Sequence, residues 1–469
     1  MYQRDDILCG RLALPDGIPL FDPTYRTLCR LASSQACPEF HRRADAALTS
    51  TLGSDDWRLL AAAARREGVA PLLYHALKEQ KIRGAEAPRR RGEQSSSPHL
   101  PIPPSPHLSS VPPDVQTDLR QAYYAATARN LLIYRELSRI LAALAAAPPD
   151  RNLRPPIPVI LLKGAALAAT LYPSIGLRPM GDLDILAPGE RLAEAVACLK
   201  ALGYGEPYPE MAAGLNALAG HHVNLQGGRD IHLTVELHWT LIGGEHDWRS
   251  PSLPWFWQQT EPLPNPQYPI PNPQSPFSIL QLTPTAHLLY LCAHLMLQHG
   301  EARSVLRWFY DIHLLVTQES HRIDWYELIL RAQEFRWAAA LYAALAGTAA
   351  RFATPLPAGL LESLMDGADP RDQALVQRKA GPQTRGERVS DVLASLSWRA
   401  RLRLLLVNVI PSPAYVRWRY KPRPAWLWPL CYSYRWLDIL REGLTTLWRM
   451  ASSRIADGRS QEERTGIHH

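Results

Sequence analysis

The chain has 469 residues and a formal net charge of +7, with 46% hydrophobic and 20% charged residues. This composition is ordinary for a globular protein of two or three domains, and it excludes a fibre or a wholly disordered chain.

The first residues lack the basic start and apolar run of a signal peptide, and no window holds the ~18 uninterrupted apolar residues that a membrane-spanning helix needs. We therefore expect a cytoplasmic protein. The six cysteines lack Cys-x-x-Cys spacing, which favours neither a zinc site nor a disulfide framework.

Two proline-rich segments divide the chain, and each contains a short repeat, Ser-Pro-His-Leu in the first and Pro-Asn-Pro-Gln in the second. Proline at this density removes backbone donors and prevents a helix or a central strand. We interpret both segments as surface insertions, although an SH3-type ligand would look similar. The expected regions are 1–87, helical; 88–113, a disordered insert; 114–261, a core with a leading helix; 262–276, a proline-rich loop; 277–375, a helical domain; and 376–469, a basic aromatic region with a disordered end.

The core begins with an apolar run that ends in Lys163-Gly164, which predicts a short strand breaking into a helix. The later sequence Arg178-Pro-Met-Gly-Asp182-Leu-Asp184-Ile-Leu predicts a second strand. Because side chains i and i+2 of a strand share a face, Asp182 and Asp184 should project together. Two like charges repel unless a cation lies between them, and hard oxygen ligands suit Mg²⁺ or Mn²⁺.

A further strand supplies a third carboxylate. Residues 230–239 alternate strictly between apolar and polar side chains, with Glu236 and His238 on the polar face. We predict Glu236 as the third metal ligand and His238 as a residue that supports the ligands. His221, His222, His232 and His238 cluster in sequence, but their spacing matches no zinc motif.

These motifs resemble the polymerase-β-like nucleotidyltransferases, in particular a bacterial group of uncharacterised nucleotidyltransferases that looks related to abortive-infection toxin transferases. The matching pieces are Leu161–Leu167, Leu171–Pro173, Arg178–Leu186, Leu202–Tyr204 and Val235–Trp239. The resemblance extends over residues 55–440, with specific motifs only in 158–240. It implies an α/β (α+β) fold in which a nucleotidyltransferase core with a small mixed sheet, at 114–261, is flanked by helical N- and C-terminal regions.

The resemblance also implies the reaction. A nucleoside monophosphate would move from an NTP, expected to be ATP, to a hydroxyl of an unidentified acceptor, and pyrophosphate would leave. Asp182, Asp184 and Glu236 would be the catalytic residues and the ligands of Mg²⁺ or Mn²⁺. Removing either aspartate should relieve repulsion and leave stability unchanged or higher. The acceptor stays open among protein, RNA and small molecule.

The phosphate site departs from the family pattern, which has Gly-Ser or Gly-Gly after the first strand. Here Gly164 precedes Ala165, so no serine hydroxyl is present. The triphosphate would depend on backbone N–H groups at the helix N-terminus, on Lys163 and on Arg178. The alternative function is a catalytically inactive nucleotide-binding or interaction module; the presence of all three acids favours the enzyme.

In the helical domain, the resemblance implies contacts with the nucleotide. Asp311 is therefore a predicted nucleotide-binding residue, and His294 is a candidate for contact with base or ribose. A core His–Asp pair that ties two helices is the alternative.

The C-terminal region is strongly basic. Between Val376 and Arg454, fifteen Lys or Arg stand against four Asp or Glu, with tryptophans and tyrosines interleaved. Such a segment is typical of binding to nucleic acid, to a membrane surface or to an acidic protein. The remaining interpretation is that the aromatic side chains pack on a helical core and the arginines stay solvated.

Overall fold

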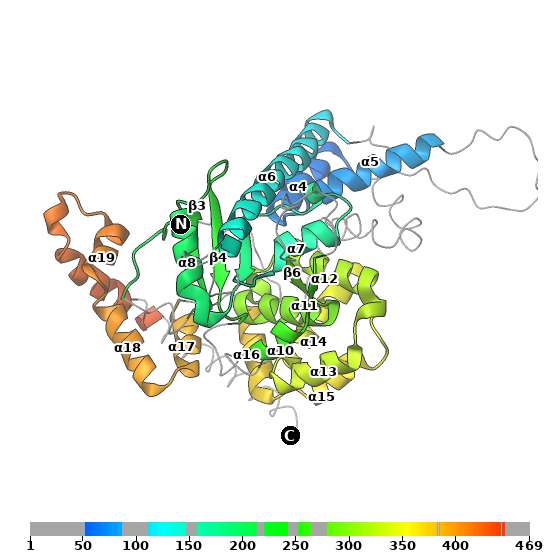
Figure 1. Ribbon diagram of the computed structural model, residues 1–469. Helices are drawn as coiled ribbons and strands as arrows, with labels where there is room; N and C mark the ends of the chain where they lie inside the picture. The colour runs from blue at the N-terminus through cyan, green and yellow to red at the C-terminus, as the bar shows by residue number, and fades with distance from the viewer. Residues whose placement is uncertain are drawn as a thin grey trace, which may run out of the picture. The chain divides into compact units, whose positions relative to one another are not determined.

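A computed structural model describes residues 52–86, 111–146, 157–212, 220–242, 252–263, 279–381, 383, 385–441 and 443–445 (Figure 1). Most of the predicted inserts at 88–113 and 262–276 lies outside these residues, as does the end of the chain. Within the described part, no helix is long and apolar enough to cross a membrane.

The chain forms two compact units. The first comprises Met1–Gly205, Asn224–Leu241 and Pro251–Gly381, and the second comprises Glu206–Val223, Ile242–Ser250 and Pro382–His469. The domain boundaries expected from the sequence stay predictions.

A six-stranded sheet forms the centre of the first unit, with the strand order β3-β4-β2-β1-β6-β5. The strands are β1 Ile160–Leu161, β2 Asp182–Leu186, β3 His222–Gly227, β4 Leu233–His238, β5 Thr260–Pro262 and β6 Leu280–Leu282. β2 pairs with β4 and β1 with β6 in parallel, whereas β1–β2 and β5–β6 are antiparallel. The sheet is therefore mixed, which confirms the predicted α/β class.

Three helices precede the sheet: α4 Ser54–Arg66, α5 Ala70–Glu86 and α6 Pro113–Ala146. α6 confirms the predicted leading helix and lies against α4 and α5 (Figure 1). Its buried apolar side chains, among them Leu119, Ile133, Leu137 and Leu144, recur at helical spacing on one face. The helix also buries the polar residues Asn130, Glu136 and Ser138, of which Asn130 and Glu136 hold the segment that enters β2 and the connection before β4.

Helices connect and cover the strands. Those between the strands are α7 Lys163–Thr170, η2 Ile175–Leu177, η3 Gly189–Arg191, α8 Leu192–Ala201 and α10 Leu253–Gln258. Those that follow the sheet are α11 Pro284–Ala293, the π-helix η4 His294–His299, η5 Glu301–Arg303, α12 Leu306–Glu319, η6 Ser320–Arg322, α13 Trp325–Glu334, α14 Ala338–Phe352, α15 Leu360–Asp366 and α16 Pro370–Ala380. α14 contacts α11, α12, α13, α15 and α16, so it forms the centre of this helical part (Figure 1).

The second unit is helical. Its elements are α17 Arg385–Ser395, α18 Trp398–Val409, α19 Pro413–Tyr420 and η7 Ala425–Leu427, and residues 430–441 are also helical. A small core of Leu396, Ala400, Leu404 and Val407 packs with Met211, Ala212 and Leu393. The Ser412 amide and hydroxyl donate to the carbonyls of Met211 at 2.7 Å and Glu210 at 2.9 Å.

Candidate active site

The register of two parallel strands brings the predicted carboxylates together. In the β2–β4 ladder, Asp184 lies opposite Glu236 and Asp182 lies opposite Thr234. Because the alternate residues Leu183 and Val235 are fully buried, they occupy the core side of the sheet. Asp182, Asp184 and Glu236 therefore share the other face.

A lysine and a histidine converge on Asp184. Lys163 Nζ lies 2.8 Å from Asp184 Oδ1, and His238 Nε2 lies 3.1 Å from the same oxygen. Since an ionised carboxylate only accepts hydrogen bonds, His238 donates from Nε2. His238 Nε2 is also 3.6 Å from Glu236 Oε2. Ligand atoms of Asp184, Glu236 and His238 all lie within 4.8 Å of one another, a spacing that can hold a metal ion.

The two aspartates differ in their electrostatics. Burial alone would raise the pKa of Asp184, but the Lys163 charge and the His238 hydrogen bond hold that pKa well below its usual range. Burial among protein atoms, followed by repulsion from Asp184 and Glu236, raises the pKa of Asp182 to about 6, although its side chain stays accessible to solvent. Asp182 is thus an accessible carboxylate destabilised by its acidic neighbours, and a bound cation would relieve this repulsion.

The strand-to-helix turn has an unusual backbone. Lys163 has a φ of 45°, in the left-handed region that non-glycine residues rarely adopt, and strain of this kind clusters at functional sites. The Leu162 amide donates to the Asp184 carbonyl at 3.1 Å, which fixes the turn to β2. The helix starts at Lys163, one residue before the predicted break at Gly164, and its first N–H groups lack intrahelical acceptors.

Arg178 lies behind this turn and pairs with Asp311. The guanidinium donates to both carboxylate oxygens at 2.9 and 2.7 Å, and the Tyr172 hydroxyl donates to Asp311 at 2.7 Å. A Cβ added to Gly164 would come within 2.5 Å of Arg178 Nη1. The two predicted nucleotide-binding residues thus bind each other in a buried pair that supports Gly164, and Arg178, rather than His294, is the charged partner of Asp311.

The segment that enters β2 is held by α6. Asn130 donates to the carbonyls of Ile175 at 2.6 Å and Arg178 at 2.8 Å. Arg129 donates to the carbonyls of Met180 at 2.9 Å and Gly181 at 3.1 Å. Asp182 follows directly, so α6 sets its position.

The helical part contributes aromatic groups near the carboxylates. The Tyr290 hydroxyl is buried and has no hydrogen bond of normal geometry among the described residues. Tyr290 lies within electrostatic reach of Lys163 and Asp184, and burial raises its pKa. Burial, together with the charges of Lys163 and Arg303, lowers the pKa of His299 to about 4.

A π-helix carries His299. The ring centroid of His299 lies 4.6 Å from that of His294 and 4.5 Å from that of Trp308. π-helical turns are rare in proteins, and those that occur are often found at functional sites. His294, one of the predicted residues, is therefore part of an aromatic group at the site's helical side.

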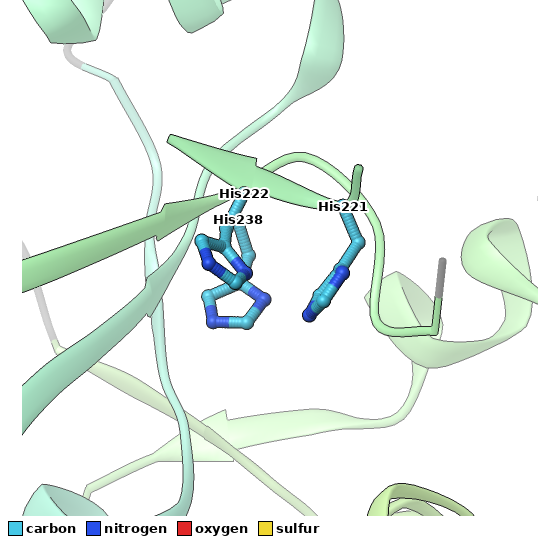
Figure 2. A group of neighbouring side chains, drawn as sticks. All are labelled: His221, His222 and His238. Atoms are coloured by element: carbon cyan, nitrogen blue, oxygen red, sulfur yellow. The ribbon is translucent and has the colours of Figure 1, made fainter. Parts of the chain in front are cut away.

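Figure 2 shows His238 together with His221 and His222. The ring centroids of His221 and His222 lie 4.2 Å apart with the planes at 86°. Since His238 donates to Asp184, we assign it to the carboxylate site, as the sequence predicts.

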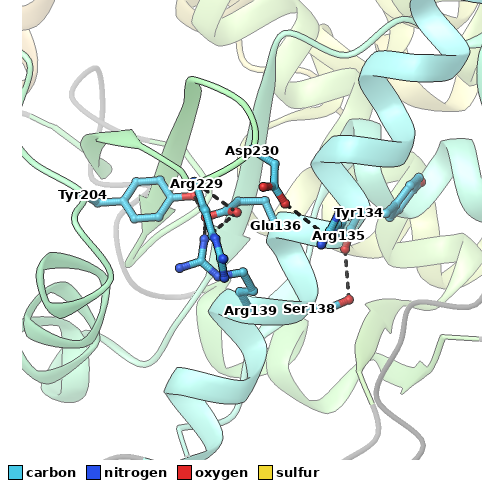
Figure 3. Close-up of polar contacts among 8 residues, drawn as sticks. All are labelled: Tyr134, Arg135, Glu136, Ser138, Arg139, Tyr204, Arg229 and Asp230. Carbon is cyan, nitrogen blue, oxygen red and sulfur yellow. Dashed lines mark hydrogen bonds and ion pairs between the residues drawn. The ribbon is translucent and has the colours of Figure 1, made fainter.

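A second polar network supports β4 from Glu136, about two turns further along α6 than Asn130 (Figure 3). Glu136 is fully buried and accepts hydrogen bonds from the Tyr204 hydroxyl at 2.9 Å, from Arg139 at 2.8 and 2.9 Å, and from the Arg229 amide at 3.5 Å. Arg229 lies in the connection between β3 and β4. The network therefore anchors the strand that carries Glu236.

Residues 53–353 match the model of a protein family described as uncharacterised nucleotidyltransferases. The chain belongs to this family. The matched range contains every residue predicted for the site, including Lys163, Asp182, Asp184, Glu236 and Asp311. The comparison with curated proteins gave no match.

The candidate site includes residues that the sequence did not reveal. Tyr290 lies on α11, a helix whose residues are all buried, so no polar periodicity marks it. Asn130 lies on α6 among apolar residues, where its bonds to two carbonyls could not be foreseen. Tyr172 was part of a matching motif, but its bond to Asp311 required the fold.

Proposed function

We propose that this nucleotidyltransferase moves a nucleoside monophosphate from an NTP to a hydroxyl of a protein, RNA or small molecule and releases pyrophosphate. ATP is the donor to test first. The family supports the transfer of a nucleotidyl group, and acids on adjacent parallel strands of a small mixed sheet fit a polymerase-β-like core.

The donor set fits a hard divalent cation. Asp182, Asp184 and Glu236 offer carboxylate oxygens on one face, the ligand chemistry that Mg²⁺ and Mn²⁺ prefer. Burial, followed by repulsion from Asp184 and Glu236, raises the pKa of Asp182, and a cation bound between these acids would relieve that repulsion. When bound, the metal would neutralise phosphate charge and lower the pKa of the attacking hydroxyl.

The strand-to-helix turn would receive the phosphates. The first N–H groups of α7 point outward from the helix N-terminus and carry a partial positive charge. The Lys163 ammonium adds a full positive charge beside them. Its ammonium neutralises Asp184 in the nucleotide-free chain and would exchange this partner for a phosphate oxygen. We assign Arg178 and Asp311 to support of this turn from behind, because their side chains bind each other.

Glu236 is the candidate base. It is partly exposed, with 22% of its side chain accessible, and lies opposite Asp184. Glu236 would take the proton from the acceptor hydroxyl while that oxygen bonds to the α-phosphorus and the bond to the pyrophosphate oxygen breaks. The observation that carries the proposal is the register of β2 and β4, which sets Asp184 beside Glu236, together with the ion pair that Lys163 forms with Asp184.

The test is a labelling reaction. Purified full-length protein would be incubated with each α-labelled NTP, Mg²⁺ and a cell extract, and label would be followed in protein, RNA and small-molecule fractions. We expect one fraction to become labelled in step with pyrophosphate release. Asp182→Asn, Asp184→Asn and Glu236→Gln should each abolish labelling.

A matched control is Asp230→Asn, which removes an acid that pairs with Arg135 at 3.2 Å, away from the site. This variant should label as the parent does. Nucleotide binding without transfer to any fraction would favour the inactive nucleotide-binding module and would overturn the proposal.

A further inference from the structure

One face of α18 exposes a continuous apolar stripe. Its members are Trp398, Leu402, Leu405, Leu406 and Val409, whose side chains are 42% to 68% exposed. Their spacing of three or four residues places them on a single side of the helix, α18, which Figure 1 labels. The opposite side carries Ala400, Leu404 and Val407, which pack into the core of the second unit. The helix is thus apolar on two sides, and among the described residues of the unit only one of these sides packs into a core.

Arginines border the stripe on both sides. At 3.6 residues per turn, Arg399 and Arg403 fall beside Leu406, and Arg401 falls beyond Leu405 on the other edge. All three are exposed. Arginine side chains can cover apolar surface with their stems while their charged ends reach an anionic layer.

A second helical stripe is fixed to the first. In residues 430–445, Leu430, Tyr434, Leu437 and Leu444 are 60% to 67% exposed and recur at helical spacing. Trp436 Nε1 donates to the Val409 carbonyl at 2.8 Å, and the neighbouring arginine, Arg435, donates to the Asn408 carbonyl at 2.7 Å. These bonds satisfy carbonyls at the end of α18, so both stripes belong to one rigid frame.

The charge of this frame is predominantly positive. Residues 396–445 contain nine Lys or Arg and two Asp or Glu. An apolar surface surrounded by cations is complementary to a layer that is anionic outside and apolar beneath.

We propose that the second unit binds the surface of a bilayer that contains anionic lipid, with α18 lying in the plane of the interface. With 12 residues, α18 is about 18 Å long, much shorter than the ~30 Å hydrocarbon core, so it lies on the bilayer. The identity of the exposed side chains favours lipid over nucleic acid: four of the five stripe residues on α18 are aliphatic, and aliphatic side chains neither stack on bases nor bind phosphates.

The test uses full-length protein and flotation with vesicles of phosphatidylcholine, alone or mixed with phosphatidylglycerol. The protein should float with the mixed vesicles, stay behind with the neutral ones, and bind less as salt rises. In vesicles of brominated lipid, tryptophan fluorescence should be quenched, and Trp398→Phe should remove part of that quenching.

Two pairs of variants separate the apolar and charged contributions. Leu405→Asn with Leu406→Asn should lower vesicle affinity at least tenfold, whereas Leu59→Asn with Leu330→Asn, at positions 62% and 42% exposed in the first unit, should not. Arg399→Gln with Arg403→Gln, which removes two of the arginines that border the stripe, should lower vesicle affinity about 30-fold. The control pair, Arg120→Gln with Arg371→Gln, removes two charges that are also exposed, but in the first unit, and should leave vesicle affinity unchanged.

Several results would overturn the proposal. These are absence of flotation, equal binding to neutral and anionic vesicles, or parental binding by the leucine variant. Single-stranded RNA binding that responds to the arginine variant but not to the leucine variant, without flotation, would assign the face to nucleic acid. If the parent self-associates without floating and the leucine variant does not self-associate, the exposed face would be assigned to binding a second copy of the chain.

Discussion

Lys163 and Asp184 form an ion pair of 2.8 Å in which the two side chains are 13% and 5% exposed. The pair joins the first residue of α7 to the middle of β2. Asp182, two residues earlier on the same strand face, lies at the accessible end of that strand. One Asp-x-Asp motif therefore holds a stabilised carboxylate and a destabilised one.

The first prediction separates these aspartates. In metal-free protein, Asp184→Asn should lower the free energy of unfolding by about 3 kcal/mol, because it leaves the Lys163 charge buried without its closest partner. Asp182→Asn should raise the free energy of unfolding, because it removes repulsion from Asp184 and Glu236. Chemical denaturation in the presence of a chelator measures both changes.

The same experiment with Mn²⁺ tests the metal site. Mn²⁺ should stabilise the parent, and both variants should lose most of that increment. For Asp182 this prediction agrees with the expectation from sequence that stability would be unchanged or higher; for Asp184 the ion pair with Lys163 leads us to predict the opposite. A shift of the two metal-free variants in the same direction would contradict the assigned role of Lys163.

The second prediction concerns acid stability. Burial lowers the pKa of His287 to about 4; the Asp311 charge partly opposes this shift and the Arg178 charge adds to it. In the unfolded chain the pKa is about 6.5. Because the unfolded state takes up the proton first, the contribution of neutral His287 is fully present above about pH 6.5 and is lost as the pH falls towards about 4.

This loss should amount to on the order of 3 kcal/mol for the parent. His287→Gln should show a shallower decline of the free energy of unfolding over the same range, and His321→Gln, at an exposed position, should follow the parent. Equal slopes for the parent and His287→Gln would mean that His287 is not held neutral in the core.

Much of the fold was readable because its strands and helices carry strong periodicity. The alternation in β4 and the Asp-x-Asp of β2 assigned each side chain to a face, and the register confirmed that these faces coincide. α6 was readable for the same reason. β5 and β6 have three residues each, too few for a period of two to show.

The polar pairs of the site could not be read from the sequence. Arg178 and Asp311 are 133 positions apart, and each alone resembles a nucleotide-binding residue. Lys163 beside a glycine predicts an anion site, and only the antiparallel register of β1 and β2 brings it to Asp184. Contacts between distant segments depend on tertiary packing, which local patterns do not encode.

The third prediction concerns the turn before α7. Gly164→Ala should destabilise the protein by about 1 to 3 kcal/mol, because the added Cβ would lie 2.5 Å from Arg178 Nη1, which its pair with Asp311 holds in place. Gly164→Ala should also weaken nucleotide binding, because it disturbs the turn that would receive the phosphates. Gly181→Ala is the matched control, since its Cβ would meet nothing within 4 Å.

Thermal denaturation and nucleotide titration measure the two effects of this change. Parental stability for Gly164→Ala would show that Arg178 moves freely, and its role as a support of the turn would then be wrong.

The last prediction concerns Tyr290, whose buried hydroxyl has no hydrogen bond of normal geometry among the described residues and interacts with the Lys163 ammonium. Tyr290→Phe removes this costly group and should leave the free energy of unfolding equal or up to about 1 kcal/mol higher. Because the hydroxyl lies within electrostatic reach of Lys163 and Asp184, we expect it to bind the substrate, and the transfer rate should fall about tenfold. Tyr172→Phe is the contrasting control: it breaks a 2.7 Å bond to Asp311 and should lower stability by about 1 to 3 kcal/mol. A stable Tyr290→Phe protein with the parental transfer rate would show that the buried hydroxyl has no part in the reaction.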